Sequence, residues 1–156
     1  MDIIKILTNP VLLIPACAWG VAQILKTIIN AIVNKKLSLS RLVGDGGMPS
    51  GHSATVTSLA VMCGFAKGFD SAEFAIAAIL AIIVMHDASG VRLETGKQAL
   101  SIIKIAEMLN DYVLESDSHI KTDKLKVLVG HTPLQVACGS LLGAVIAIGY
   151  HLISVG

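Results

Sequence analysis

Aromatic and charged residues are both scarce in this chain of 156 residues. Phe, Trp and Tyr together make up 4% of the sequence, and Asp, Glu, Lys and Arg make up 15%. With a formal net charge of +1, the chain has neither the basic surface nor the stacking platform typical of nucleic-acid binding. We therefore expect no nucleic-acid partner.

Cysteine is also rare, and its placement argues against a disulfide framework and a zinc site. Cys17, Cys63 and Cys138 each lie inside an apolar stretch, with no CxxC spacing and no clustered histidines nearby. This pattern is typical of small buried hydrophobic residues and not of a disulfide or zinc framework. The sequence predicts no metal site.

Apolar residues, in contrast, make up 54% of the chain, and the mean hydropathy is +0.75. This exceeds the apolar share of ordinary globular proteins and points to a bilayer as the solvent. The N-terminus carries Asp2 and Lys5 and lacks a basic region followed by a cleavage site. We therefore expect no removable signal peptide, and we predict a multi-pass integral membrane protein.

Four apolar segments cover residues 10–33, 53–69, 72–85 and 136–155, and polar connections separate them. Residues 96–114 have an amphipathic helical pattern, which suits either a helix on the membrane surface or a cover over a site. Gly139 and Gly143 have the spacing of close helix packing. We predict an all-α membrane bundle of about four transmembrane helices plus one amphipathic helix, as a single domain over residues 1–156.

The first apolar segment contains an unexpected polar stripe. Gln23, Lys26, Asn30 and Asn34 recur every three or four residues and therefore share one helix face. A lysine in a spanning segment costs about 2.5 to 3.5 kcal/mol when central. Lys26 either snorkels to the headgroups or is a buried functional group, and the polar residues on its face favour the second interpretation.

A glycine-rich turn, residues 46–55, leads directly into the second apolar segment. It places the Ser50 hydroxyl, the Gly51 backbone and the His52 imidazole at the start of a helix, where an anion binds well. The alternative interpretation is a plain helix start with Ser50 or Ser53 as the N-cap.

The predicted topology brings scattered polar residues to one membrane face. If the first helix ends at that face, the glycine-rich turn, the end of the third segment and the start of the last segment all lie there too. The residues that converge are Lys26, Ser50, His52, Asp87, Arg92 and His131. Nine Lys or Arg also lie on that side, against Lys5 and Lys67 on the other, so the positive-inside rule makes it cytoplasmic.

With these residues the chain resembles the PAP2 family of membrane phosphatases, related to the vanadium haloperoxidases, and above all its divergent small branch. The sequence Pro49-Ser50-Gly51-His52 matches the family's second motif. Residues 130–136, followed by Gly139 and Gly143, look like the third motif, where a nucleophilic histidine precedes the last helix. The helix bearing Lys26 looks like the first motif. The resemblance covers nearly the whole chain.

Three positions depart from the family's pattern. Val33 stands where the first motif has an arginine, so that Lys35, Lys36 or Arg41 would serve instead. Leu125 stands where the third motif has an arginine, which Arg92 or, less well, Lys126 would replace. Gln135 stands where the third motif has an aspartate; an amide can orient an imidazole but cannot stabilise imidazolium as a carboxylate does, so Asp87 is the candidate for that role.

The resemblance implies a hydrolase of a lipid phosphate or an isoprenoid phosphate or diphosphate, in a bacterial plasma membrane, without metal or other cofactor. His131 would be the nucleophile that forms a phosphohistidine, His52 the general acid and base, and Asp87 the partner of an imidazole. The residues implied to bind substrate are Lys26, Ser50, Gly51, Arg92 and Gln135. The alternatives are a protein that binds or transports a phosphorylated lipid without turnover, and a structural module without a ligand; any of these could form a homo-oligomer.

Overall fold

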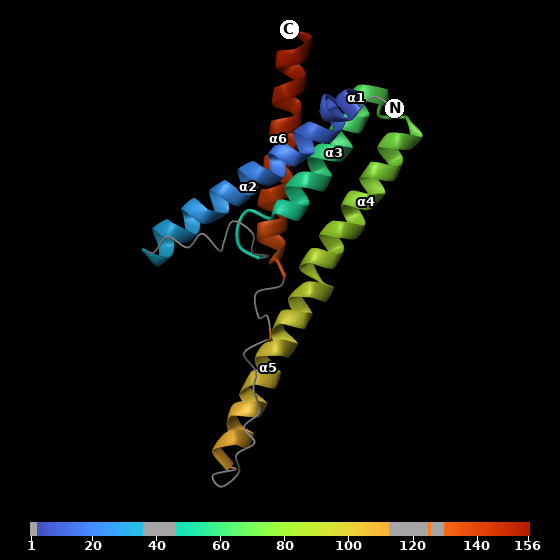
Figure 1. The fold of residues 1–156 in the computed structure, drawn as a ribbon. Helices are drawn as coiled ribbons and strands as arrows, with labels where there is room; N and C mark the ends of the chain where they lie inside the picture. The colour runs from blue at the N-terminus through green and yellow to red at the C-terminus, as the bar shows by residue number, and fades with distance from the viewer. Residues whose placement is uncertain (1–2, 36–45, 113–124, 126–129) are drawn as a thin grey trace.

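The computed structural model describes residues 3–35, 46–112, 125 and 130–156, and these residues form helices and connections without a strand. The helices are α1 (Ile3–Leu7), α2 (Pro10–Asn34), α3 (Gly51–Lys67), α4 (Ala72–Ser89), α5 (Val91–Tyr112) and α6 (Pro133–Val155). α3 packs against α2, α4 and α6, and so forms the centre of the bundle (Figure 1). The predicted all-α membrane bundle is confirmed.

Three helical stretches among the described residues are long and apolar enough to cross a membrane. They are α2, the continuous stretch Ala72–Asn110 formed by α4 and the greater part of α5, and α6. α3 has 17 residues, at the lower limit of a spanning helix. Its buried face carries serines as well as apolar residues, because its neighbours in the bundle, and not lipid, surround it.

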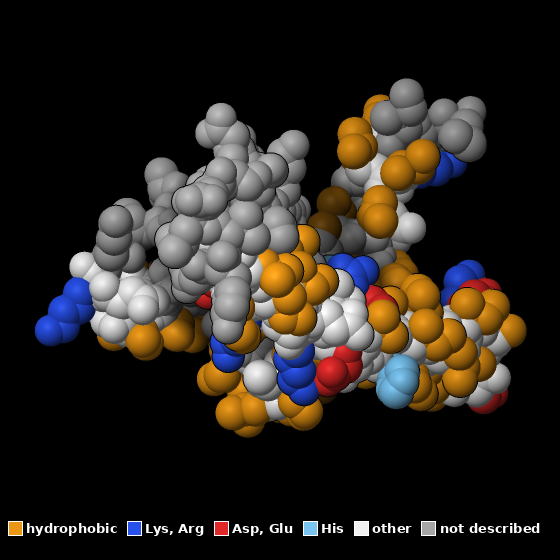
Figure 2. Space-filling view, turned by 90° about the horizontal axis from the view of Figure 1, so that it is seen from below, with side chains coloured by type: hydrophobic (Ala, Val, Ile, Leu, Met, Phe, Trp, Pro, Cys, Tyr) orange, Lys and Arg blue, Asp and Glu red, His pale blue; other side chains and the backbone are white. Residues whose placement is uncertain are grey.

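The surface of the described part is strongly apolar. Many large hydrophobic side chains are exposed, including Ile76 at 69%, Leu141 at 68% and Ile153 at 84%. Hydrophobic side chains make up much of the described surface that is visible in Figure 2. An apolar surface of this extent is expected where lipid chains surround a protein.

The α3–α6 contact depends on small residues. A Cβ atom on Gly139 would overlap the backbone carbonyl of Ser50, and one on Gly143 would overlap that of Ala54. The predicted close packing at these two glycines is therefore confirmed. A core of Ala18, Ala22 and Ala54 lies beside this contact, with Leu142 and Ile146 packed against it.

The helices α4 and α5 differ from the predicted segments. We expected the third apolar segment to end at residue 85 and a separate amphipathic helix to begin at 96. Instead α4 continues to Ser89, only Gly90 interrupts the helical course, and the two helices form one long rod (Figure 1). Hydropathy marked where the apolar run stops, but backbone hydrogen bonding continues through the polar residues that follow.

Candidate phosphate-binding site

Two glycines shape the turn that precedes α3. Gly46 and Gly47 have φ values of 79° and 89°, in the left-handed region that only glycine adopts easily. The turn directs the Gly47 carbonyl toward His131, whose Nδ1 lies 3.2 Å away. A bond between positions 84 residues apart thus joins the two segments that resemble the second and third motifs.

His131 lies just before α6 and is 1% exposed. Its backbone N–H donates to the Ala88 carbonyl at 2.9 Å, which attaches the segment to the end of α4. Its Nδ1 faces two oxygens, the Gly47 carbonyl at 3.2 Å and Gln135 Oε1 at 3.3 Å. Because a carbonyl can only accept, Nδ1 carries the proton, and Nε2 is left with its lone pair.

The Nε2 atom of His131 is buried and has no hydrogen-bond partner among the described residues. Burial lowers the pKa of this imidazole; the hydrogen bond to Gln135 opposes that effect, and the charges of His52 and Lys26 add to it. The net direction is downward, so the neutral ring predominates near neutral pH. A neutral imidazole with a free Nε2 lone pair is the form a nucleophile needs.

Gln135 holds its side chain in place through the start of α6. The Thr132 hydroxyl accepts from the Gln135 backbone N–H, and Gln135 Oε1 accepts from the Thr132 N–H at 3.1 Å, which makes a capping box. This second bond fixes the amide so that its oxygen, and not its nitrogen, faces His131. Sequence reasoning missed Thr132, although Thr-x-x-Gln before an apolar run is the signal of a capping box.

Lys26 is buried in this structure, at 4% exposure, as the polar stripe predicts. Its methylenes lie against Gly47, where an added Cβ would be 3.1 Å from Lys26 Cγ. Lys26 also lines a cavity of about 170 Å³ with Asn30, Gly47 and Met48. The lysine is close enough to His131 to lower the pKa of that imidazole.

His52 and Gly51 form the first turn of α3. The His52 ring lies 5.7 Å from the His131 ring between centroids, at an interplanar angle of 67°. Gly51 is buried, and a Cβ there would lie 3.2 Å from Trp19 Cδ1. A side chain at this position would need Trp19 to shift by a few tenths of an ångström.

Ser50 is the N-cap of α3, which is the alternative we left open. The residue is fully buried, and its Oγ accepts from the Ser53 N–H at 3.3 Å. Its backbone N–H donates to the Gln135 carbonyl at 3.0 Å, so the cap also ties α3 to α6. A further role in substrate binding stays a prediction.

Asp87 and Arg92 pair with each other on the half-exposed surface where α4 meets α5. Arg92 Nε lies 2.6 Å from Asp87 Oδ2, and the two side chains are 43% and 40% exposed. The neighbouring Ala88 carbonyl links this corner to the His131 backbone. The imidazole contact for which we considered Asp87 is made here by Gln135 and Gly47.

The first turns of α5 cover one side of the site. A cavity of about 220 Å³ lies between the start of α5 and the segments that hold His131; its lining includes Gly47, Leu93, Lys97, Gly130 and Gln135. The amphipathic pattern of residues 96–114 suited either a helix on the membrane surface or a cover over a site. The position of the first turns of α5 fits the cover. Lys36, Arg41 and Lys126, the other candidate cations, lie outside the described residues.

No cluster of three His, Cys, Asp or Glu that could hold a metal ion occurs within the described residues. The groups that the described residues bring to the site are imidazole, amine, hydroxyl and backbone amide. The imidazoles, the hydroxyl and the backbone amide lie at the starts of α3 and α6, and the amine of Lys26 lies on α2. Together they define a helical membrane protein with a buried polar site.

The chain belongs to the divergent PAP2 family, whose family model matches residues 7–146. It is 41% identical over 150 residues to the uncharacterized membrane protein YuiD of Bacillus subtilis (strain 168), an alignment that covers 92% of this chain and 95% of that protein. No solved structure is significantly similar to the chain. The resemblance found in the motifs is thus confirmed over nearly the whole length.

Proposed function

We propose that this protein is a membrane phosphatase that hydrolyses a lipid phosphate or an isoprenoid phosphate or diphosphate through a phosphohistidine. The observation that carries the proposal is the state of His131. Its Nδ1 proton is held by Gly47 and Gln135, which leaves the Nε2 lone pair available, and the buried Lys26 is near enough to lower the pKa of the ring. Membership of the divergent PAP2 family supports the same chemistry.

In the first step His131 Nε2 attacks the phosphorus atom, and the bond from phosphorus to the leaving oxygen breaks. His52 donates a proton to that oxygen, so the alcohol or the phosphate leaves in protonated form. In the second step His52 takes a proton from water, the water oxygen bonds to phosphorus and the bond from nitrogen to phosphorus breaks. Inorganic phosphate leaves, and both imidazoles return to their starting states.

The phosphoryl oxygens need fixed positive charge and N–H donors while negative charge builds on them. Lys26 supplies a buried amine, and the Gly51 N–H and the Ser50 hydroxyl stand at the start of α3, where the helix dipole favours an anion. Arg92 would also bind the phosphoryl oxygens once its ion pair with Asp87 is broken and the phosphate takes the place of the carboxylate. Gln135 positions His131, and Asp87 positions Arg92.

We propose that the site opens to the cytoplasm across a bacterial plasma membrane. In the predicted topology, the membrane face that holds the site carries Lys35, Arg92 and Lys97, and the opposite face carries Lys5 and Lys67. The positive-inside rule supports this orientation. The relative from Bacillus subtilis supports a bacterial membrane.

The experiment follows phosphate release from lipid phosphates and isoprenoid diphosphates by the purified protein in lipid nanodiscs. We expect His131→Gln to abolish release and His86→Gln, which changes an exposed histidine of α4, to leave it unchanged. Wild-type release no higher than that of His131→Gln would remove the hydrolase proposal.

The second candidate is a protein that binds or transports a phosphorylated lipid without turnover. The neutral Gln135 beside His131 favours it, because an amide stabilises imidazolium less than a carboxylate does. Vanadate or lipid-phosphate binding that depends on Lys26, without phosphate release, would support this candidate over the first.

A further inference from the structure

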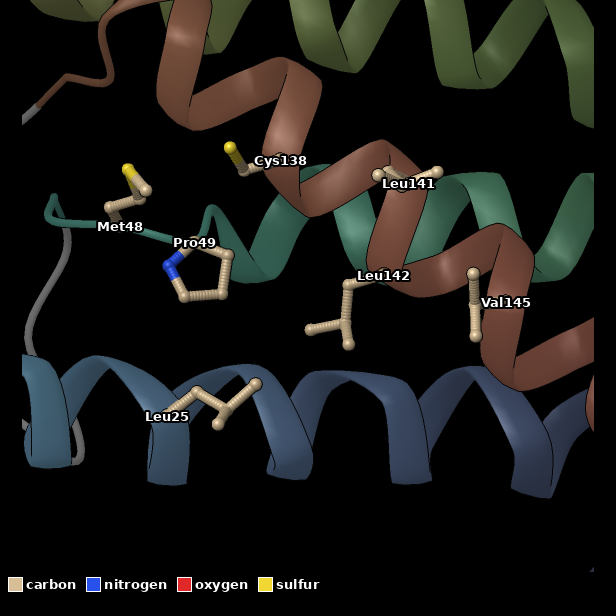
Figure 3. Close-up of a pocket in the computed structure, with 7 residues that line it drawn as sticks. All are labelled: Leu25, Met48, Pro49, Cys138, Leu141, Leu142 and Val145. Carbon is tan, nitrogen blue, oxygen red and sulfur yellow. The ribbon is translucent and has the colours of Figure 1, made fainter.

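An apolar groove of about 370 Å³ lies between α2 and α6, next to the proposed phosphate site. Figure 3 shows side chains from both helices and from the turn before α3 around it. The residues that matter below are Leu25, Met48, Pro49, Leu141, Leu142 and Val145. Its volume is in the range of small-ligand pockets.

The groove is continuous with the polar site. Met48 lines the groove and also the cavity that contains Lys26 and Gly47. Pro49 follows it directly and precedes the Ser50 cap and His52. A molecule with its phosphate beside Lys26 therefore has an apolar path past Met48 and Pro49, between the helices.

The groove also faces outward. Leu141 is 68% exposed and Val145 58%, so α6 presents this wall to the lipid chains around the bundle. Leu25, on the α2 side, is 36% exposed. A lipid could thus slide sideways into the groove from its own leaflet, without leaving the hydrocarbon layer.

We propose that this groove binds one hydrocarbon chain of the molecule whose phosphate the polar site holds, an inference that rests on the proposed function. The chain would enter from the bilayer and lie along α6 from Met48 toward Val145. Because the chain is already surrounded by hydrocarbon, the groove selects by shape and packing and not by hydrophobicity. It is therefore the part of the site that decides which lipid phosphates fit.

The test uses two photoreactive probes in nanodiscs. One is dodecyl phosphate with a diazirine at the far end of its chain, and the other is the matching dodecyl alcohol. After illumination, mass spectrometry maps the labelled residues. We expect the phosphate probe, far more than the alcohol, to label the groove residues of α6 and Leu25, and Lys26→Met to remove this preference.

Three results would overturn the inference. Equal labelling by the two probes would mean that ordinary bilayer chains fill the groove. Phosphate-dependent labelling at other residues would place the chain elsewhere, and cross-links between two copies of the protein at these residues would make the groove an oligomer interface.

Groove-filling variants supply the matched comparison. Val145→Trp should reduce groove labelling at least about tenfold, as expected when a pocket is filled. Leu152→Trp should not, because it changes an equally accessible residue of the same helix outside the groove. Leu25→Trp with Ile24→Trp as its control repeats the comparison from the α2 wall, in case Val145→Trp fails to fold. Unchanged labelling in both groove variants would also refute the inference.

Labelling does not depend on turnover, so the two proposals can fail separately. Phosphate-dependent labelling of the groove without any phosphate release would refute the hydrolase and leave the groove assignment standing. Phosphate release together with labelling outside the groove would do the reverse.

Discussion

The side-chain oxygen of Gln135 lies 3.3 Å from Nδ1 of His131, four residues earlier in the chain. The same oxygen also accepts from the Thr132 N–H. Gln135 therefore holds the imidazole in the tautomer that leaves Nε2 unprotonated, with the Gly47 carbonyl as the second acceptor. The residue that departs from the family's third motif keeps the orienting part of the aspartate's role. It lacks only the charge.

Replacing Gln135 with Met should lower phosphate release about fivefold, because one hydrogen bond of about 1 kcal/mol that orients His131 is lost. It should also cost up to about 1 kcal/mol of stability through the capping box. Ser71→Ala is the control, since it removes the N-cap of α4, a helix end that includes no proposed site residue. Kinetics and thermal unfolding are measured for both; equal activity in the two variants would contradict the role of Gln135.

The buried position of Lys26 leads to a binding prediction. Lys26→Met should weaken vanadate binding about 10- to 100-fold, the value of a hydrogen bond to a charged group. Lys67→Met, at the exposed end of α3, should bind as the wild type does. Titration of vanadate against each protein gives the affinity. Equal affinities would mean that Lys26 is a structural lysine.

The lowered pKa of His131 predicts how stability depends on pH. The ordinary value is 6.5, and the folded protein has a lower one, so between the two the unfolded chain binds more protons. The contribution of His131 to stability is present above about pH 6.5 and is lost as the pH falls through the folded-state pKa.

Thermal unfolding over a pH series checks this sign. The wild type should lose stability on acidification from about pH 7 to about pH 5, and His131→Gln should lose less, because it lacks the titrating ring. Phosphate release should fall over the same range, as His131 is protonated. A larger acid loss in His131→Gln than in the wild type would show that the pKa moves the other way.

The α3–α6 contact predicts opposite effects for two glycines of one helix. Gly143→Ala should destabilise the protein by about 1 to 3 kcal/mol, because the methyl group would overlap the Ala54 carbonyl. Gly149→Ala should be neutral or stabilising by up to about 1 kcal/mol, since nothing lies within 4 Å of its Cβ position. Unfolding in nanodiscs measures the stability of both variants. Equal stability would mean that α3 and α6 can move apart at Gly143 at little cost.

Sequence patterns predicted the membrane bundle, the buried Lys26 and the approach of Pro49–His52 to His131. They could do so because hydropathy and helical period are local properties, and because a bilayer forces successive spans to alternate in direction. The same locality explains the errors at α4 and α5. Where the apolar run stops is visible in the residues, but whether the helix stops there depends on backbone hydrogen bonds.

The sequence by itself determined that the chain is a helical membrane protein. It also showed that Lys26, the glycine-rich turn, His52 and His131 follow one another in the order of the PAP2 motifs. Only the tertiary structure decided that the Gly47 carbonyl faces His131 and that the starts of α3 and α6 meet at one site. It also produced the groove between α2 and α6. The physical reason is distance along the chain, because a contact across 84 residues depends on how helices pack, and no local pattern encodes which oxygen will face which nitrogen.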